Sequence, residues 1–130
     1  MTAASSSVTF TGVIPPVATP LLPDGTIDHV SLERLVERLI AEGVSGLFAL
    51  GSTGETAYFT DDQRVELLTT IVRVNAGRVP IIAGAIELTA PRIIETARRL
   101  VAAGAQAIVT TAPLYTCLLY TSPSPRDQRG

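Results

Sequence analysis

Two adjacent hydroxyl side chains, Ser52 and Thr53, lie between glycines in the segment 51–55, which reads GSTGE. This segment directly follows the short apolar run 46–50 (GLFAL). Ligands of parallel α/β folds bind at the carboxyl ends of strands, where such a segment would lie. Glycines let the backbone approach a ligand, and hydroxyls with backbone N–H groups can hold a carboxylate. The predicted substrate-binding residues are therefore Gly51, Ser52, Thr53 and Gly54. The alternative is a tight turn capped by Ser or Thr.

Tyr115 is a second candidate, because it follows the apolar run 106–111 (QAIVTT) at the carboxyl end of another expected strand. A phenol that is hydrogen-bonded to a hydroxyl can pass protons. The alternative is a tyrosine that only packs at the end of a strand. Two polar groups at the same edge of a sheet support each other as parts of one site.

Other polar residues carry weaker signals. Glu55 is either a general base or a side chain that bonds backbone amides in the turn. Glu87 follows the third apolar run and could line the mouth of the site. His29, the one histidine, is predicted to lie at the solvated surface. No cluster of His, Cys or carboxylate residues has the spacing of metal ligands, so neither a metal nor a cofactor is predicted.

Four short apolar runs alternate with three amphipathic segments. The runs predict strands near 13–18, 46–50, 79–83 and 106–110, and the amphipathic segments predict helices near 28–42, 61–76 and 89–103. Starts about 30 residues apart are typical of successive βα units. Strands that are apolar without alternation suit a parallel sheet buried on both faces. We therefore expect one parallel sheet in chain order, with the helices on one face.

The predicted helices have recognisable ends. Asp28 and Thr89 are expected N-caps, and Thr60 with Gln63 forms a capping box. In the third helix, apolar residues at helical spacing predict a buried face. These residues are Ile93, Ala97, Leu100 and Val101.

Length and composition indicate one globular domain. The 130 residues carry a net charge of -2, and no basic stripe interleaved with aromatics occurs, so nucleic acid is not an expected partner. No run of 18 apolar residues occurs, so no membrane association is expected. The N-terminus lacks the pattern of a secretory signal, and the one cysteine, Cys117, can form no internal disulfide. A cytoplasmic protein is expected.

Both ends of the chain differ from the patterned part. Residues 1–11 are predicted to be a flexible N-terminal tail. Residues 117–130 (CLLYTSPSPRDQRG) have no helical face and contain two Ser-Pro pairs, which is typical of a disordered tail. The stretch CLLYTSPSPRD also resembles translated sequencing-library adapter. On that interpretation the natural chain ends near Thr116 and the remainder is foreign.

Four segments together carry a family resemblance: GVIPPVATP at 12–20, GSTGE at 51–55, VPIIAG at 79–84 and TAPLY at 111–115. They resemble the dihydrodipicolinate synthase / N-acetylneuraminate lyase family. The resemblance implies a (β/α)₈ TIM barrel, of which residues 12–116 would form the N-terminal half, a truncated barrel of about four βα units. It also implies a lyase that binds pyruvate or another 2-oxo acid as a lysine Schiff base. The full-length parent would be a homo-oligomer, since family members are often tetramers.

The same resemblance assigns roles. Thr53 would hold the carboxylate of the 2-oxo acid, and Ser52 and Tyr115 would act catalytically in a proton relay. The chain contains no lysine, because all ten basic residues are arginines. The Schiff-base lysine and the second tyrosine of the family have no counterpart here, so the chain as given is predicted to be inactive.

Alternatives stay open at this point. Lysine-pathway synthases typically read PYY where this chain has Pro113-Leu114-Tyr115, so a sugar-acid aldolase or dehydratase of the same family is a second prediction. A carboxylate-binding half-barrel without catalysis, or a purely structural or interaction domain, belongs to another class of function.

Overall fold

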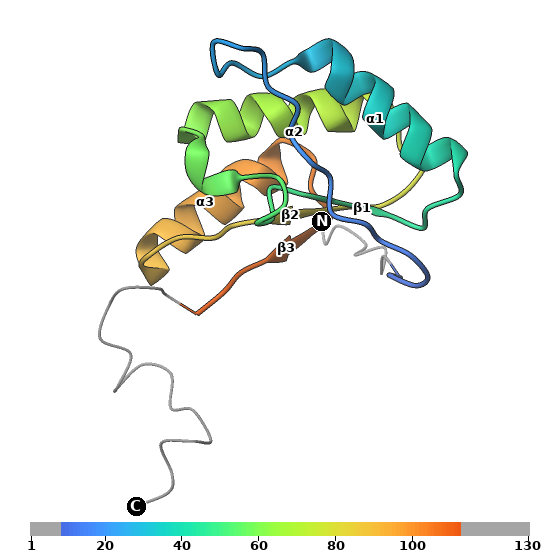
Figure 1. Cartoon of the computed structure of the whole chain (residues 1–130). Coiled ribbons are helices and arrows are strands. Elements are labelled where there is room, and N and C mark those ends of the chain that lie inside the picture. Colours follow the sequence, from blue (N-terminus) through green and yellow to red (C-terminus); the bar gives the residue numbers. More distant parts are fainter. Residues whose placement is uncertain (1–8, 113–130) are drawn as a thin grey trace, which may run out of the picture.

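Three short strands form one parallel sheet in the order β1–β2–β3, which is also their order in the chain. The computed structural model describes residues 9–112 (Figure 1). In chain order the elements are α1 (His29–Ala41), β1 (Leu47–Ala49), the 3₁₀ helix η1 (Thr56–Tyr58), α2 (Asp61–Asn75), β2 (Ile81–Gly84), α3 (Ala90–Ala102) and β3 (Ala107–Val109). The prediction of alternating strands and helices around a parallel sheet is confirmed.

The first predicted strand, near 13–18, lies beside β1 but forms a single bridge, between Pro16 and Phe48, instead of a full strand. Its direction is parallel, as predicted. The Phe48 N–H donates to the Pro15 carbonyl at 3.0 Å, and the Val17 N–H donates to the Phe48 carbonyl at 2.8 Å. Residues 15 and 17 thus face β1, and because Pro15 has no N–H group to donate, the ladder cannot continue toward the N-terminus.

The core lies between the sheet and the helices. Alternate strand residues point toward the helices and are fully or almost fully buried, because successive side chains of a strand face opposite sides. They are Leu47, Ala49, Ile81 and Ala83. From the helices, Leu32, Leu68 and Ile71 pack into the same cluster. In Figure 1 the helices α1 and α2 lie above the strands, and α3 lies beside β2 and β3.

The buried face of α3 differs from the prediction at two positions. Leu100 is buried and Ile93 and Ala97 pack against the core, as predicted, but Val101 is 54% exposed. Thr96 is buried instead. Its hydroxyl donates to the Glu87 carboxylate at 3.2 Å, and this bond explains why a polar side chain occupies a position on the inner face.

The three α-helices comprise 13, 15 and 13 residues. Within residues 9–112 no helix is long and apolar enough to span a membrane.

The helix starts follow the predicted capping chemistry at two of three positions. Asp28 accepts a hydrogen bond from the Ser31 N–H at 3.0 Å. The Thr60 hydroxyl accepts from the Gln63 backbone N–H at 3.3 Å, while the side-chain Oε1 of Gln63 accepts from the Thr60 backbone N–H at 2.9 Å, which completes the capping box. Thr89 occupies the N-cap position of α3, but its side chain makes no capping bond.

We expect Thr60→Ala to lower the free energy of unfolding by about 1 kcal/mol, because it leaves a backbone N–H of the first turn without its acceptor. Thr89→Ala is the matched control and should change stability much less, since no capping bond is lost. Urea titration followed by circular dichroism measures both. Equal losses in the two variants would contradict the capping argument.

Candidate functional site

The turn that follows β1 begins with a strained residue. Leu50 has a φ of 59° and is completely buried. A left-handed backbone is unfavourable for a bulky side chain, so tertiary contacts must hold it there. Residues in such conformations cluster at ligand-binding and catalytic sites. The strain falls directly before the GSTGE segment, which the sequence singles out for chemistry.

Close backbone contacts hold this turn in place. A Cβ atom at Gly84, the last residue of β2, would lie 2.1 Å from the Leu50 carbonyl oxygen. A Cβ atom at Gly54 would lie 2.9 Å from the Val17 carbonyl oxygen. The buried hydroxyl of Thr19 donates to the Gly54 carbonyl at 2.8 Å. The turn is therefore clamped between the end of β2 and the segment that runs beside β1.

Two hydroxyls project from the clamped turn. Gly51 and Gly54 are buried, whereas Ser52 and Thr53 between them are exposed. The turn closes through the N–H groups of Gly54 and Glu55, which donate to the carbonyls of Gly51 and Ser52, both at 3.1 Å. Within residues 9–112 the N–H groups and hydroxyls of Ser52 and Thr53 have no protein partner. The predicted position at the carboxyl end of a strand is confirmed, and the exposed donors match those of an anion-binding turn.

A hollow of about 340 Å³ adjoins the turn. Its lining residues are Ser52, Glu55, Thr56, Ala57, Tyr58 and Ile86. The Thr56 hydroxyl is buried and has no hydrogen-bond partner in the described part of the chain. Ser52 therefore borders a mainly apolar hollow, and its exposed hydroxyl is a polar group able to bind a small molecule there.

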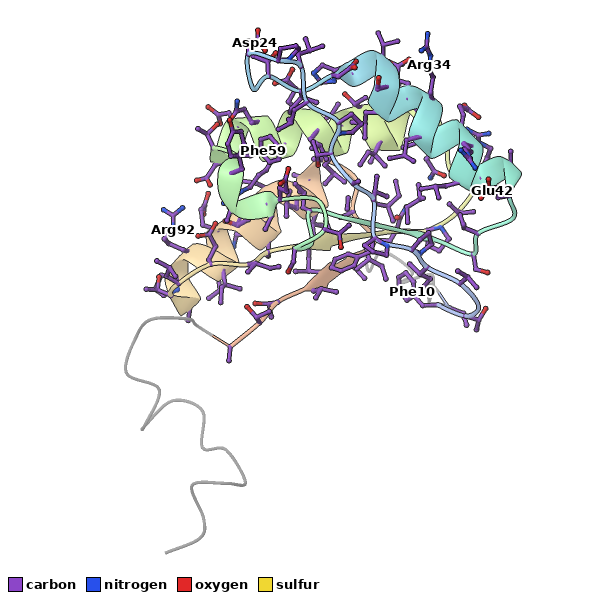
Figure 2. All side chains as sticks on the ribbon, in the orientation of Figure 1. Phe10, Asp24, Arg34, Glu42, Phe59 and Arg92 are labelled. Carbon is purple, nitrogen blue, oxygen red and sulfur yellow. The ribbon has the colours of Figure 1, made fainter. Side chains whose placement is uncertain are left out.

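A buried ionic cluster lies between this turn and the connection from β2 to α3. Glu87 accepts hydrogen bonds from Arg64, from the Arg92 Nε at 3.0 Å and from Thr96. Glu87 and Arg64 are each 8% exposed. Burial raises the pKa of the Glu87 carboxyl, but hydrogen bonds from Arg92 and Arg64, with their charges, outweigh burial and hold that pKa below its usual value. Figure 2 shows Arg92 at the same end of the molecule as Phe59, the residue after η1.

The residues predicted from the sequence have different outcomes. Ser52, Thr53 and the flanking glycines share one exposed turn, whereas Tyr115 lies outside the described residues, as do 1–8 and the whole of 113–130. Glu55 is exposed, and within residues 9–112 its side chain makes no hydrogen bond, so bonding of backbone amides is not seen. Glu87 belongs to the buried cluster and not to an open mouth.

His29 lies at the surface in the first turn of α1, as predicted, but its side chain is only 35% exposed because it also contacts α2. Its Nδ1 lies 3.0 Å from the Thr70 hydroxyl, and its Nε2 lies 2.9 Å from the Glu66 carboxylate. The histidine therefore joins two helices.

Sequence reasoning missed Arg64, which has a signal that could have revealed it. Arg64 precedes Leu67, Leu68 and Ile71 by three, four and seven positions, so it occupies the inner face of α2. A charged residue on an otherwise apolar helix face requires a buried partner of opposite charge.

The lowered pKa of Glu87 predicts an acid-dependent loss of stability. A carboxyl whose pKa is lower in the folded than in the unfolded protein stabilises the fold above the unfolded pKa. That contribution disappears as the pH falls below the usual glutamate pKa of about 4.3 and through the lower folded value. We therefore expect Glu87→Gln to be less stable than wild type at pH 7, with a difference that narrows toward pH 3. Urea titrations of both proteins between pH 7 and pH 3 measure this difference in the free energy of unfolding. A difference that does not change with pH would contradict the argument.

We expect Gly84→Ala to displace the turn after β1, because its Cβ would overlap the Leu50 carbonyl. Overpacking of this kind costs about 1–3 kcal/mol. Gly77→Ala is the control, since no atom lies within 4 Å of a Cβ there and only its left-handed φ of 75° is unfavourable. Amide NMR shifts of residues 50–54 should change in the first variant and stay unchanged in the second.

Comparison with known proteins places the chain in a family. Residues 9–120 match the model of the dihydrodipicolinate synthetase family. A 4-hydroxy-tetrahydrodipicolinate synthase from Xanthomonas axonopodis pv. citri is 44% identical over 108 residues, which are 82% of this chain and 35% of that protein. The corresponding enzyme from Sorangium cellulosum is 36% identical over 111 residues, 85% of this chain and 37% of that protein.

Solved structures agree with these relatives. The dihydrodipicolinate synthase of Acinetobacter baumannii, complexed with pyruvate, matches with a TM-score of 0.80 and 36% identity, over 82% of this chain and 37% of that one. A prophage protein of the same family from E. coli K12, also in complex with pyruvate, matches with a TM-score of 0.78 and 36% identity, over 82% of this chain and 36% of that one. The chain therefore spans little more than a third of the length of these relatives. By its sequence and its fold, which corresponds to part of their TIM barrels, the chain belongs to the dihydrodipicolinate synthetase family.

Proposed function

We propose that the turn 51–54 holds the carboxylate of a 2-oxo acid such as pyruvate, as part of a lyase that acts through a Schiff base. The observation that carries this proposal is the exposed pair Ser52 and Thr53, clamped between buried glycines at the carboxyl end of β1. Two relatives of the same fold are described as pyruvate complexes, which supports this class of ligand. Within residues 9–112 the hydroxyl and N–H groups of Ser52 and Thr53 have no protein partner, so they can donate hydrogen bonds to a carboxylate.

The two hydroxyls have different proposed roles. Thr53 holds the carboxylate, while Ser52 and Tyr115 form a proton relay. A relay needs hydroxyl groups within hydrogen-bond reach of each other and of the reacting atoms. Ser52 suits this role because its side chain borders the hollow beside the turn.

The covalent step requires an amine that this chain does not have. A primary amine converts a carbonyl substrate to an electrophilic iminium, and hydroxyl groups cannot replace it. All ten basic residues are arginines, so the N-terminal α-amine is the only primary amine in the chain. We therefore propose that the chain binds the 2-oxo acid without turning it over, and that the lyase activity and the homo-oligomeric assembly belong to a longer parent protein.

A second candidate reaction within the family is the cleavage or dehydration of a sugar acid. It is favoured by Ser52, where lysine-pathway synthases usually have threonine, and by Pro113-Leu114-Tyr115, where they typically have PYY. Both candidates require the same carboxylate-binding turn, so they differ in the second substrate and not in the role of Thr53.

Titration of the full chain with pyruvate should shift the amide NMR signals of residues 51–55. Thr53→Val removes a hydroxyl at nearly constant volume, and we expect it to weaken pyruvate binding about tenfold, the effect of losing one hydrogen bond to a charged group. Thr69→Val, on the exposed side of α2, is the matched control and should bind as wild type does. Equal affinity in all three proteins would exclude Thr53 as a carboxylate ligand.

Treatment of the chain with pyruvate and borohydride should leave its mass unchanged. Iminium trapping requires an unprotonated amine held in attack geometry. The α-amine has a pKa of about 8, so at most a slow and unspecific reaction is expected. Mass spectrometry after tryptic digestion is the measurement. Stoichiometric labelling of one defined residue, or measurable aldol turnover, would overturn the proposal that the chain is not a catalyst.

A further inference from the structure

Arg64 is a buried cation for which the proposed reaction has no use. It lies on the inner face of α2, is 8% exposed, and reaches its two main acceptors with different nitrogens. Its Nε donates to the Thr56 carbonyl at 3.0 Å, and its Nη1 donates to the Glu87 carboxylate. A third contact, from Nη1 to Asp61, is 3.5 Å long.

The two main acceptors belong to different loops. Thr56 begins η1, directly after the GSTGE segment, and its N–H donates to the Gly51 carbonyl at 3.4 Å. Glu87 lies in the connection from β2 to α3 and is itself held by Arg92 and Thr96. Figure 1 shows both connections at the same end of the sheet. Arg64 therefore connects the far end of the turn to a second, independently anchored loop.

The burial of these charges needs a reason beyond stability. Taking a guanidinium and a carboxylate out of water is costly, and apolar residues of similar volume often stabilise a fold as well or better. What an apolar side chain cannot supply is a second donor for the Thr56 carbonyl, which among the described residues otherwise accepts only from the Phe59 N–H, at 3.4 Å. The arrangement therefore suits the fixing of a loop better than the filling of a core.

We propose that Arg64 is a positioning residue for the exposed pair Ser52 and Thr53, because it joins the carbonyl at the end of their turn to Glu87 on the neighbouring loop. This inference rests on the proposed function for the meaning of the turn, but the clamp itself is testable without any ligand. Arg64 does not touch the presumed position of the carboxylate; it acts through the backbone of residues 51–56.

The geometry requires arginine rather than lysine. A guanidinium presents Nε and Nη donors in a rigid plane, so it reaches two acceptors in fixed directions at once. A lysine carries one nitrogen on a flexible stem. Arg64→Lys therefore keeps a positive charge beside Glu87 but cannot hold both loops in the same way.

Amide hydrogen exchange of the full chain tests the clamp. In Arg64→Lys and Arg64→Met we expect exchange at Gly54, Glu55 and Thr56 to be about tenfold faster than in wild type, since their turn loses its outer support. Amides of Leu67 and Leu68 within α2 should keep their wild-type rates in Arg64→Lys, which separates a local effect from general loosening. Arg78→Met is the matched control, because it removes a two-bond ion pair between Glu37 of α1 and the loop that follows α2.

Pyruvate titration of the same variants tests the link to function. We expect Arg64→Lys to bind pyruvate about tenfold more weakly than wild type, and Arg78→Met to bind it equally. If Arg64→Met does not fold, Arg64→Lys decides the question. Unchanged exchange at residues 54–56 in Arg64→Lys, or equally faster exchange throughout α2, overturns the inference. If wild type itself does not bind pyruvate, the proposed function fails, while the exchange rates still decide whether Arg64 holds the turn.

Discussion

The Leu50 carbonyl oxygen occupies the space that a side chain at position 84 would need, and the candidate site depends on this close approach. The parallel register that pairs Ala49 with Ala83 brings Gly84 directly beside Leu50. Because Leu50 is buried and has a left-handed φ, the chain leaves β1 sharply at this point. Gly54 then packs against the Val17 carbonyl. Within the turn 51–54, Gly51 and Gly54 are buried, which leaves Ser52 and Thr53 pointing outward. The exposure of these two residues therefore results from the sheet geometry.

The parts of the fold that depend on local patterns were predictable from the sequence. Strand order, helix positions and the Thr60 capping box follow from apolar spacing and from short-range hydrogen bonding. The position of Ser52 and Thr53 at a strand end was predictable for the same reason. The left-handed conformation of Leu50 was not, because bulky residues avoid it and only the contacts with β2 impose it. The length of the first strand was overestimated, since the apolar residues 13–18 suggest a continuous ladder that Pro15, which has no N–H group, interrupts.

The pairing within the ionic cluster could not be predicted from sequence patterns, because it joins residues that are distant in the chain. Arg64 and Glu87 are 23 positions apart, and charged residues are normally exposed unless they are paired. The burial of Thr96 has the same origin, since its hydroxyl completes the contacts of Glu87. Arg64 and Thr96 each interrupt an apolar helix face, and the contact with Glu87 explains both interruptions. A charged residue on an apolar helix face is thus a signal of a buried tertiary contact that sequence reasoning missed here, although the signal does not show which partner the residue has.

The charges around the turn determine what kind of binding it can offer. Arg64, Arg92 and Arg99 are matched by Glu87, Asp61 and Asp62, to which they are paired. The guanidinium groups are therefore neutralised by protein carboxylates and do not create a strong positive field at Ser52 and Thr53. A carboxylate ligand at the turn would be held by hydroxyl and N–H dipoles, which orient it but bind it weakly in water. Such a site suits a substrate that is retained mainly by a covalent bond to another group, since the turn then has to supply orientation more than affinity. Of these arginines, Arg64 also donates to the Thr56 carbonyl, in the loop that follows the turn.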